Sequence, residues 1–236
     1  FLRDSLYLYN KAILWTPEDV VLDDAGVLTL TGAGAMPDFE TGDDQPWSLD
    51  RASVFSVVGE VGITSIGSHA FDLCKKLTSV SLPGVASVGE SAFNYCTALT
   101  TVSLPEAVTI GNSAFVGCSA MTFVSLPKAT NIGEQAFDFC TQLATISIPN
   151  VTHIGGWSFD GCSNLTTVYA DNVAIIGMAA FQNCTSLAHL YSNTAAPTIN
   201  DSYVFFHVPG TAVLHLPASC QGSTWNYWPG NYSYDR

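Results

Sequence analysis

The chain has 236 residues, of which 47% are hydrophobic and only 11% are charged, a composition that excludes wholesale disorder and allows a sizeable core. Twenty acidic residues against seven basic ones give a net charge of −13, which argues against binding to nucleic acid or to an anionic membrane surface, since both need clustered lysine and arginine. The sequence has no run of about 18 apolar residues, so it predicts no membrane insertion.

Residues 1–57 are predicted to form an N-terminal cap. Residues 1–20 fit no repeat and are either a cap strand or the tail of an upstream domain, whereas residues 27–32 have the alternation of a strand. The loop Asp38–Asp44 is rich in carboxylates, and oxygen-rich loops bind calcium, but its spacing is not that of an EF-hand. We therefore expect a solvated acidic loop without a metal.

From Ile66 the sequence repeats every 22 residues, in six copies without an insertion or a deletion. The unit is [IV]-G-x-x-[AS]-F-x-x-C-x-x-[LM]-x-x-[VIL]-x-[LI]-P-x-x-x-x, and a degenerate copy precedes it, in which Val58 aligns with Val80. We predict that residues 58–192 form this repeat region. The repeated aromatic residues and thiols are Phe71, Phe93, Phe115, Phe137, Phe159 and Phe181, and Cys74, Cys96, Cys118, Cys140, Cys162 and Cys184.

Each unit contains a short segment that alternates polar and apolar residues, which predicts a strand. In one copy Val80 and Leu82 point inward, so Ser79 and Ser81 point outward. Pro83 ends the strand because proline has no N–H to donate to the ladder.

The second half of each unit places a phenylalanine and a cysteine three residues apart, as at Phe93 and Cys96. This is the spacing of one short helical or 3-10 turn. A single unit cannot bury enough apolar surface to fold alone, so the copies must stack into a solenoid.

The repeat resembles the BspA-like (treponemal-type) leucine-rich repeat, with its core L-x-x-[IV]-x-[LI]-P followed by [IV]-G-x-x-A-F-x-x-C. The resemblance is strong over residues 60–192 and weaker in both caps. It implies an α/β repeat solenoid, leucine-rich-repeat-like and right-handed, with parallel strands on one face, short helical or 3-10 turns on the other and a β-rich N-terminal cap. It also implies a secreted or surface-attached protein linked to adhesion and to binding of host molecules, with any signal peptide or anchor outside this chain.

Residues 193–236 are predicted to hold an imperfect last repeat and a C-terminal cap. The last repeat is two residues longer than the others, so that Leu214 aligns with Leu190. The tail is aromatic and polar, which suits a cap over the last strand. If the tail from Trp225 covered the outer surface of the last strands, no ligand could reach that surface.

Six of the seven cysteines share one repeat position, which predicts a buried row with a spacing of about 5 Å. We expect each thiol to be a small buried hydrophobe that donates weakly to a turn carbonyl. Disulfides between neighbouring repeats are an alternative, whereas a straight row cannot surround one ion as a metal site of four cysteines requires. Cys220 lies outside the row and is expected to be exposed.

The outward rows of the predicted strands carry hydroxyl groups toward the N-terminus and rings toward the C-terminus, and neither row holds a charge. One row is Ser81, Ser103, Ser125, Ser147, Tyr169, Tyr191 and His215, and the other is Ser79, Thr101, Phe123, Thr145, Thr167, His189 and Val213. The first four candidate ligand-binding residues, expected in one patch, are Tyr169, Tyr191, His189 and His215, and the fifth is Phe123. Exposed rings with a polar group suit protein interfaces and sugar stacking, although good strand propensity alone would also explain these residue types.

No nucleophile set, catalytic motif or zinc-ligand pair has a usable spacing, so we expect no catalytic residue, no cofactor and no metal site. The sequence predicts an extracellular or cell-surface binding or adhesion module, expected to be a monomer, that recognises a protein or glycan through its uncharged strand face. A structural spacer without a ligand is the first alternative. A metal-dependent protein or enzyme that uses the acidic loop, or His189 with His215, is the second.

Overall fold

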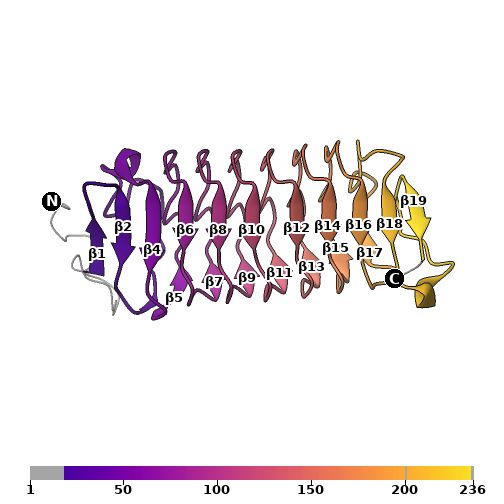
Figure 1. Ribbon diagram of the computed structural model, residues 1–236, viewed down its shortest axis with the longest axis horizontal. Helices are drawn as coiled ribbons and strands as arrows, with labels where there is room; N and C mark the ends of the chain where they lie inside the picture. The colour runs from indigo at the N-terminus through magenta and orange to yellow at the C-terminus, as the bar shows by residue number, and fades with distance from the viewer. Residues whose placement is uncertain (1–18, 200, 235–236) are drawn as a thin grey trace.

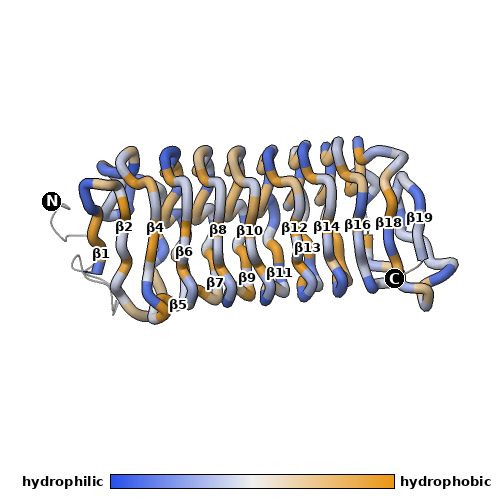
Figure 2. Tube along the Cα trace, viewed as in Figure 1, coloured by the Kyte–Doolittle hydropathy of each residue, from blue (hydrophilic) through white to orange (hydrophobic). Residues whose placement is uncertain are grey.

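The computed structural model describes residues 19–199 and 201–234. The chain winds into an elongated solenoid in which successive repeats lie side by side along one axis (Figure 1). Hydrophobic and hydrophilic residues alternate within each turn of the chain, and the alternation recurs along the stack (Figure 2). The prediction for residues 1–20 falls almost wholly outside the described residues.

One face of the solenoid is built from strands of three or four residues that pair in parallel, apart from the antiparallel pair β1 (Val20–Leu22) and β2 (Val27–Leu30). The other strands of this face are β4 (Ser56–Gly59), β6 (Ser79–Ser81), β8 (Thr101–Ser103), β10 (Phe123–Ser125), β12 (Thr145–Ser147), β14 (Thr167–Tyr169), β16 (His189–Tyr191), β18 (Val213–His215) and β19 (Asn231–Ser233). We call this face the strand face.

The second face is a continuous eight-stranded sheet of shorter parallel strands. They are β3 (Gly34–Ala35), β5 (Ile63–Ile66), β7 (Ser87–Val88), β9 (Thr109–Ile110), β11 (Asn131–Ile132), β13 (His153–Ile154), β15 (Ile175–Ile176) and β17 (Thr198–Ile199). The helical segments of the described residues are two short 3-10 helices, η2 (Arg51–Ser53) and η3 (Ala218–Cys220). Within the same residues no helix is long and apolar enough to cross a membrane.

The strand register follows the sequence repeat. Residues of β6, β8 and β10 pair with their counterparts 22 positions along the chain, and Leu190 pairs with Leu214 across the longer last repeat, as predicted. In the degenerate copy the alignment of Val58 with Val80 is wrong by one residue, because Val57 pairs with Val80, whereas Ile66 of the same copy pairs with Val88 as predicted. Val57 is buried, whereas Val58 is 36% exposed.

A stack of aromatic rings, one from each repeat, runs through the core. Neighbouring phenylalanine rings lie 5.1–5.4 Å apart between centroids and are nearly parallel. Trp47 of the N-terminal region extends the stack beyond Phe71 at 5.3 Å, and Phe205 extends it beyond Phe181 at 5.8 Å. Trp228 meets Phe205 edge-on at 5.0 Å. Each phenylalanine ring is covered on both faces by the neighbouring rings. At the two ends of the stack, Trp47 covers Phe71 and Trp228 covers Phe205.

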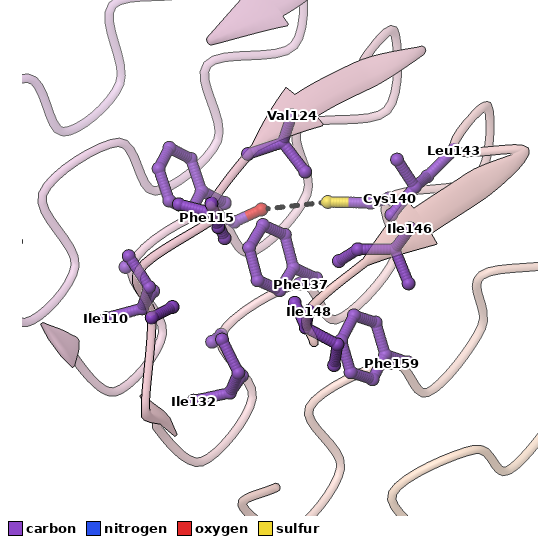
Figure 3. Close-up of a cluster of buried hydrophobic side chains, with 14 of the residues drawn as sticks. Ile110, Phe115, Val124, Ile132, Phe137, Cys140, Leu143, Ile146, Ile148 and Phe159 are labelled. Carbon is purple, nitrogen blue, oxygen red and sulfur yellow. Dashed lines mark hydrogen bonds between the residues drawn. The ribbon is translucent and has the colours of Figure 1, made fainter. Parts of the chain in front are cut away.

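The repeated cysteines form a second buried row, as predicted, and all seven cysteines are free, so the disulfide alternative is wrong. Five of them donate from Sγ to the carbonyl of the phenylalanine 25 residues earlier at 3.1–3.2 Å, as Cys140 does to Phe115 (Figure 3). Burial raises the pKa of the donating thiols well above its ordinary value, which keeps the donor proton in place, and raises that of Cys74 at the start of the row to about 12. Cys220 is buried rather than exposed, with Sγ 3.9 Å from the Asn193 carbonyl.

The third face consists of turns, and the helical or 3-10 turns expected there are not confirmed: within the described residues no helix is assigned to this part of the repeats, so the chain is a β-solenoid with almost no helix. Two residues of each repeat have left-handed backbone, for example Ser91 and Tyr95 with φ of 53° and 52°. This conformation directs alternate N–H groups to the next repeat: Phe93 donates to Ala114 at 2.8 Å, and Tyr95 donates to Val116 at 2.7 Å. An α-helix would use these donors along its own axis and would leave the repeats unlinked on this face.

The glycine near the start of each repeat is required by close approach of neighbouring backbones. A Cβ at Gly111 would lie 2.7 Å from the carbonyl carbon of Gly89, and a Cβ at Gly133 would lie 2.6 Å from that of Gly111. No side chain fits there, which explains why this position is glycine in all six copies.

We expect Cys118→Ser to lower the free energy of unfolding by about 1–3 kcal/mol, because it places a more polar group in a fully buried row and shortens the reach to its acceptor. The Sγ of Cys118 is 3.2 Å from the Phe93 carbonyl. Denaturant unfolding followed by circular dichroism measures the loss. Cys220→Ser is the control and should cost less, since Cys220 is at the surface edge of the core with a 3.9 Å contact. An unchanged Cys118→Ser variant would contradict the role of the row.

Candidate binding surface

Three rings near the C-terminal end of the strand face lie directly over one another. Tyr169 on β14, Tyr191 on β16 and His215 on β18 occupy paired positions of parallel strands. Their centroids are 4.8 Å apart for the two tyrosines and 4.1 Å apart for Tyr191 and His215, with interplanar angles of 9° and 15°. Parallel pairing causes this arrangement, because a strand spacing of about 4.8 Å brings equal positions to stacking distance.

His189 joins these rings from the neighbouring row. It pairs with Val213 in the ladder, so it lies diagonally from His215, and its Nδ1 is 3.0 Å from the Nε2 of His215. One of these nitrogens donates and the other accepts, so a single proton lies between the two rings. We call Tyr169, Tyr191, His189 and His215 the ring cluster.

The ring cluster is accessible, with His189 exposed and the other three residues half-buried. Up to Tyr234, the last described residue, the tail from Trp225 packs on the end of the core and leaves the ring cluster partly exposed. Trp225 is buried and donates from Nε1 to the Thr194 carbonyl at 3.1 Å, and Trp228 packs on the last ring of the core. These described residues of the tail therefore close the end of the solenoid.

The outward positions of β2 to β19 on the strand face hold no Asp, Glu, Lys or Arg within the described residues. The acidic charge of the chain lies elsewhere, and residues 1–65 alone hold 11 acidic and 3 basic residues. A ligand that meets this face desolvates no ion pair and no isolated charge.

The fifth candidate residue, Phe123, is not part of the ring cluster. It lies on β10, with 56% of its surface exposed, beside a groove between β10 and β12. The groove has a volume of about 310 Å³ and is lined by Phe123 together with apolar residues such as Leu126, Pro127 and Pro149.

The groove marks a split in the strand face. β10 pairs with β8 and β12 pairs with β14, but the two halves belong to separate sheets, whereas β11 and β13 keep the second face continuous behind them. Two departures from the neighbouring repeats coincide with the split: Phe123 and Ala144. Ala144 lacks the hydroxyl with which the equivalent Thr122 donates to the Thr100 carbonyl at 3.3 Å. Ala188 lacks it too and its strand stays paired, so the missing hydroxyl alone does not open the sheet.

The comparisons with known proteins agree with this architecture. Residues 51–166 and 108–221 match the family described as BspA type leucine rich repeat region (6 copies). The chain belongs to the BspA-type leucine-rich repeat family. No protein with a curated description matches it.

Solved structures with similar folds come from several bacteria, at sequence identities that inform on the fold alone. The pneumococcal vaccine antigen PcpA is 16% identical, with 90% of this chain and 58% of that chain covered and a TM-score of 0.55. A leucine rich cell surface protein from Faecalibacterium prausnitzii is 17% identical over 96% of both chains, with a TM-score of 0.47. A leucine rich repeat protein of T. pallidum is 19% identical over 92% of this chain and 85% of that chain, with a TM-score of 0.43.

The acidic loop Asp38–Asp44 caps the first BspA-type repeat. Asp38 accepts from the Ser68 N–H at 2.7 Å, and Asp44 accepts from the N–H and hydroxyl of Thr41 at 2.9 Å. Across the described residues no three metal-ligating side chains come together. Asp38 and Asp44 thus satisfy backbone donors at the end of the stack, and Asp43 pairs with the Arg51 side chain.

Two carboxylates on the turn face of the BspA-type repeats were missed by the sequence reasoning. Asp138 is 7% exposed, and its Oδ1 has no hydrogen-bond partner, while Asp160 of the next repeat accepts from Asn183 at 2.9 Å. Burial, and then the charge of Asp160, raise the pKa of Asp138 to about 7. Asp138 and Asp160 occupy the same position of neighbouring repeats. Because equal positions stack, the sequence alone could have predicted that the two carboxylates lie close together.

This geometry predicts that Asp138 lowers stability as the pH rises. In the unfolded chain the carboxyl ionises near its ordinary pKa of about 4, whereas the folded protein holds the proton until about pH 7. The unfolded state therefore gains relative stability between pH 4 and pH 7. Asp138→Asn, which stays neutral, should be more stable than the parent protein at pH 8 by about 1–3 kcal/mol and should lose this advantage at pH 4.

Denaturant unfolding at pH 4 and pH 8 measures this difference. Asp24→Asn is the control, because Asp24 is exposed, and it should not reproduce the gain in stability that Asp138→Asn gives at pH 8. An advantage of Asp138→Asn that did not change with pH would contradict a buried, neutral Asp138.

Proposed function

We propose that this protein is an extracellular or cell-surface binding module that recognises a protein or glycan through its strand face. The ring cluster is the contact point, and no catalytic role is assigned to it. The single observation that carries the proposal is the accessible stack of Tyr169, Tyr191 and His215, with His189 beside it. The strands around this stack hold no charged residue.

Stacked rings on a rigid sheet suit recognition because they are ordered before a ligand arrives. Tyrosine offers a large contact area with few rotatable bonds, so little conformational entropy is lost on binding. Its ring face packs on the apolar face of a sugar or on a protein side chain, while the hydroxyl donates or accepts a hydrogen bond. The serine and threonine rows that continue from the ring cluster toward β6 add hydroxyl groups along the same face.

An extracellular location is part of the proposal. The family resemblance favours it, and the PcpA relative is described as a vaccine antigen. The buried thiols fit it as well, because a thiol with a raised pKa and no access to solvent resists oxidation.

A binding screen against extracellular-matrix proteins, serum proteins and a glycan array tests the function. Tyr169→Ala/Tyr191→Ala should weaken binding of any hit at least about tenfold, which corresponds to about 1.4 kcal/mol. The control is Tyr95→Ala/Tyr203→Ala, which removes two exposed tyrosines (47% and 55%) that lie outside the strands of the strand face. The control should bind like the parent protein.

Binding that survives the first double variant would move the site away from the ring cluster. Binding lost equally in both double variants would indicate a general loss of folding, which circular dichroism would reveal. If no ligand is found in the whole screen, the binding proposal fails and the spacer alternative replaces it.

A further inference from the structure

Two ring nitrogens of the ring cluster lie close enough to act on one atom. Nδ1 of His189 is 3.0 Å from Nε2 of His215, and the His215 ring is held by Tyr191 at a centroid distance of 4.1 Å. All five histidines belong to the described residues, and this is the one pair in which two imidazoles meet. His69 and His207 approach side-chain oxygens instead.

The distance between the two nitrogens is also the distance that a shared metal ion needs. Imidazole nitrogens lie about 2.0–2.1 Å from Zn²⁺, and angles of about 90–110° at the metal place two such nitrogens about 2.9–3.4 Å apart. A cation can therefore take the place of the proton between His189 and His215. The rings need to rotate about their Cβ–Cγ bonds, but β16 and β18 do not need to move.

We propose that His189 and His215 form a binding site for one borderline divalent cation, Zn²⁺ or Ni²⁺, at the edge of the ring cluster. Imidazole suits these ions, whereas Ca²⁺ and Mg²⁺ take oxygen ligands. Because the described residues bring no group of three metal-ligating side chains together, the ion keeps open positions for water or for a donor atom of a ligand.

The surroundings of the pair favour a cation. No lysine or arginine occupies an outward position of β2 to β19, so within these strands no fixed positive charge opposes a cation. His189 is exposed, so a hydrated ion can reach it. The thiols, which would otherwise compete for Zn²⁺, are buried in the core.

A cation at this position would lie beside the proposed binding surface and could accept an oxygen of its ligand. The site itself depends only on the two imidazoles. Metal binding can therefore be tested whether or not a protein or glycan ligand is found.

Isothermal titration of Ni²⁺ and Zn²⁺ into tag-free protein, first stripped with a chelator, tests the site at pH 7.5. We expect one ion per chain. His189→Ala and His215→Ala should each weaken binding at least about tenfold. His153→Ala is the matched control, because His153 is an exposed histidine on β13 of the second face, and it should leave binding unchanged.

The pH dependence gives a second readout. Imidazole must be neutral to bind a metal, so binding should weaken when the pH falls from 7.5 to 5.5. No saturable binding at millimolar Ni²⁺ would overturn the proposal and leave the pair as a hydrogen-bonded contact. Binding that both single variants retain, or that His153→Ala abolishes, would overturn it equally.

Discussion

The whole structure depends on one constraint, which is that every repeat must stack on its neighbour at a step of about 5 Å. The phenylalanine rings set this step in the core, with centroids 5.1–5.4 Å apart. The strands of two faces and the alternating turns of the third face each add backbone hydrogen bonds at the same spacing. A residue that serves the core in one repeat therefore serves it in all of them, which explains why phenylalanine, cysteine and glycine recur without a change of register.

The sequence predicted what this constraint governs. The 22-residue step, the inward Val80 and Leu82, and the buried unpaired cysteines all follow from identical side chains stacking on themselves. The helical turns expected on the turn face are not confirmed, because the spacing of Phe93 and Cys96 suits a helix as well as it suits these turns. The turns are favoured over a helix because alternate backbone N–H groups on this face donate to the next repeat, which the N–H groups of a helix would not do.

Features that belong to single repeats were harder to predict. The split between β10 and β12 lies where Phe123 and Ala144 depart from the neighbouring repeats, and both stand at positions that the repeat motif leaves open. The ring cluster is intermediate in this respect. Strand register placed its four residues in neighbouring rows, but the diagonal approach of His189 to His215 depends on side-chain rotation, which the sequence does not specify. Stacking in the core does not fix the residue types of the outward-facing rows of the strand face. We therefore place the proposed binding site on these rows.

The most direct test of the stacked core is the count of reactive thiols in the native and the unfolded protein, measured without reductant. The row of buried cysteines, whose pKa values burial raises, predicts that an aromatic disulfide reagent labels almost none of them in the native state at pH 8. In denaturant the same sample should release all seven thiols. Rapid labelling of the native protein would show that the row is not buried. Only about one thiol in denaturant would mean that neighbouring cysteines pair as disulfides, and the repeats would then be held by covalent links rather than by side chains stacked on their own copies.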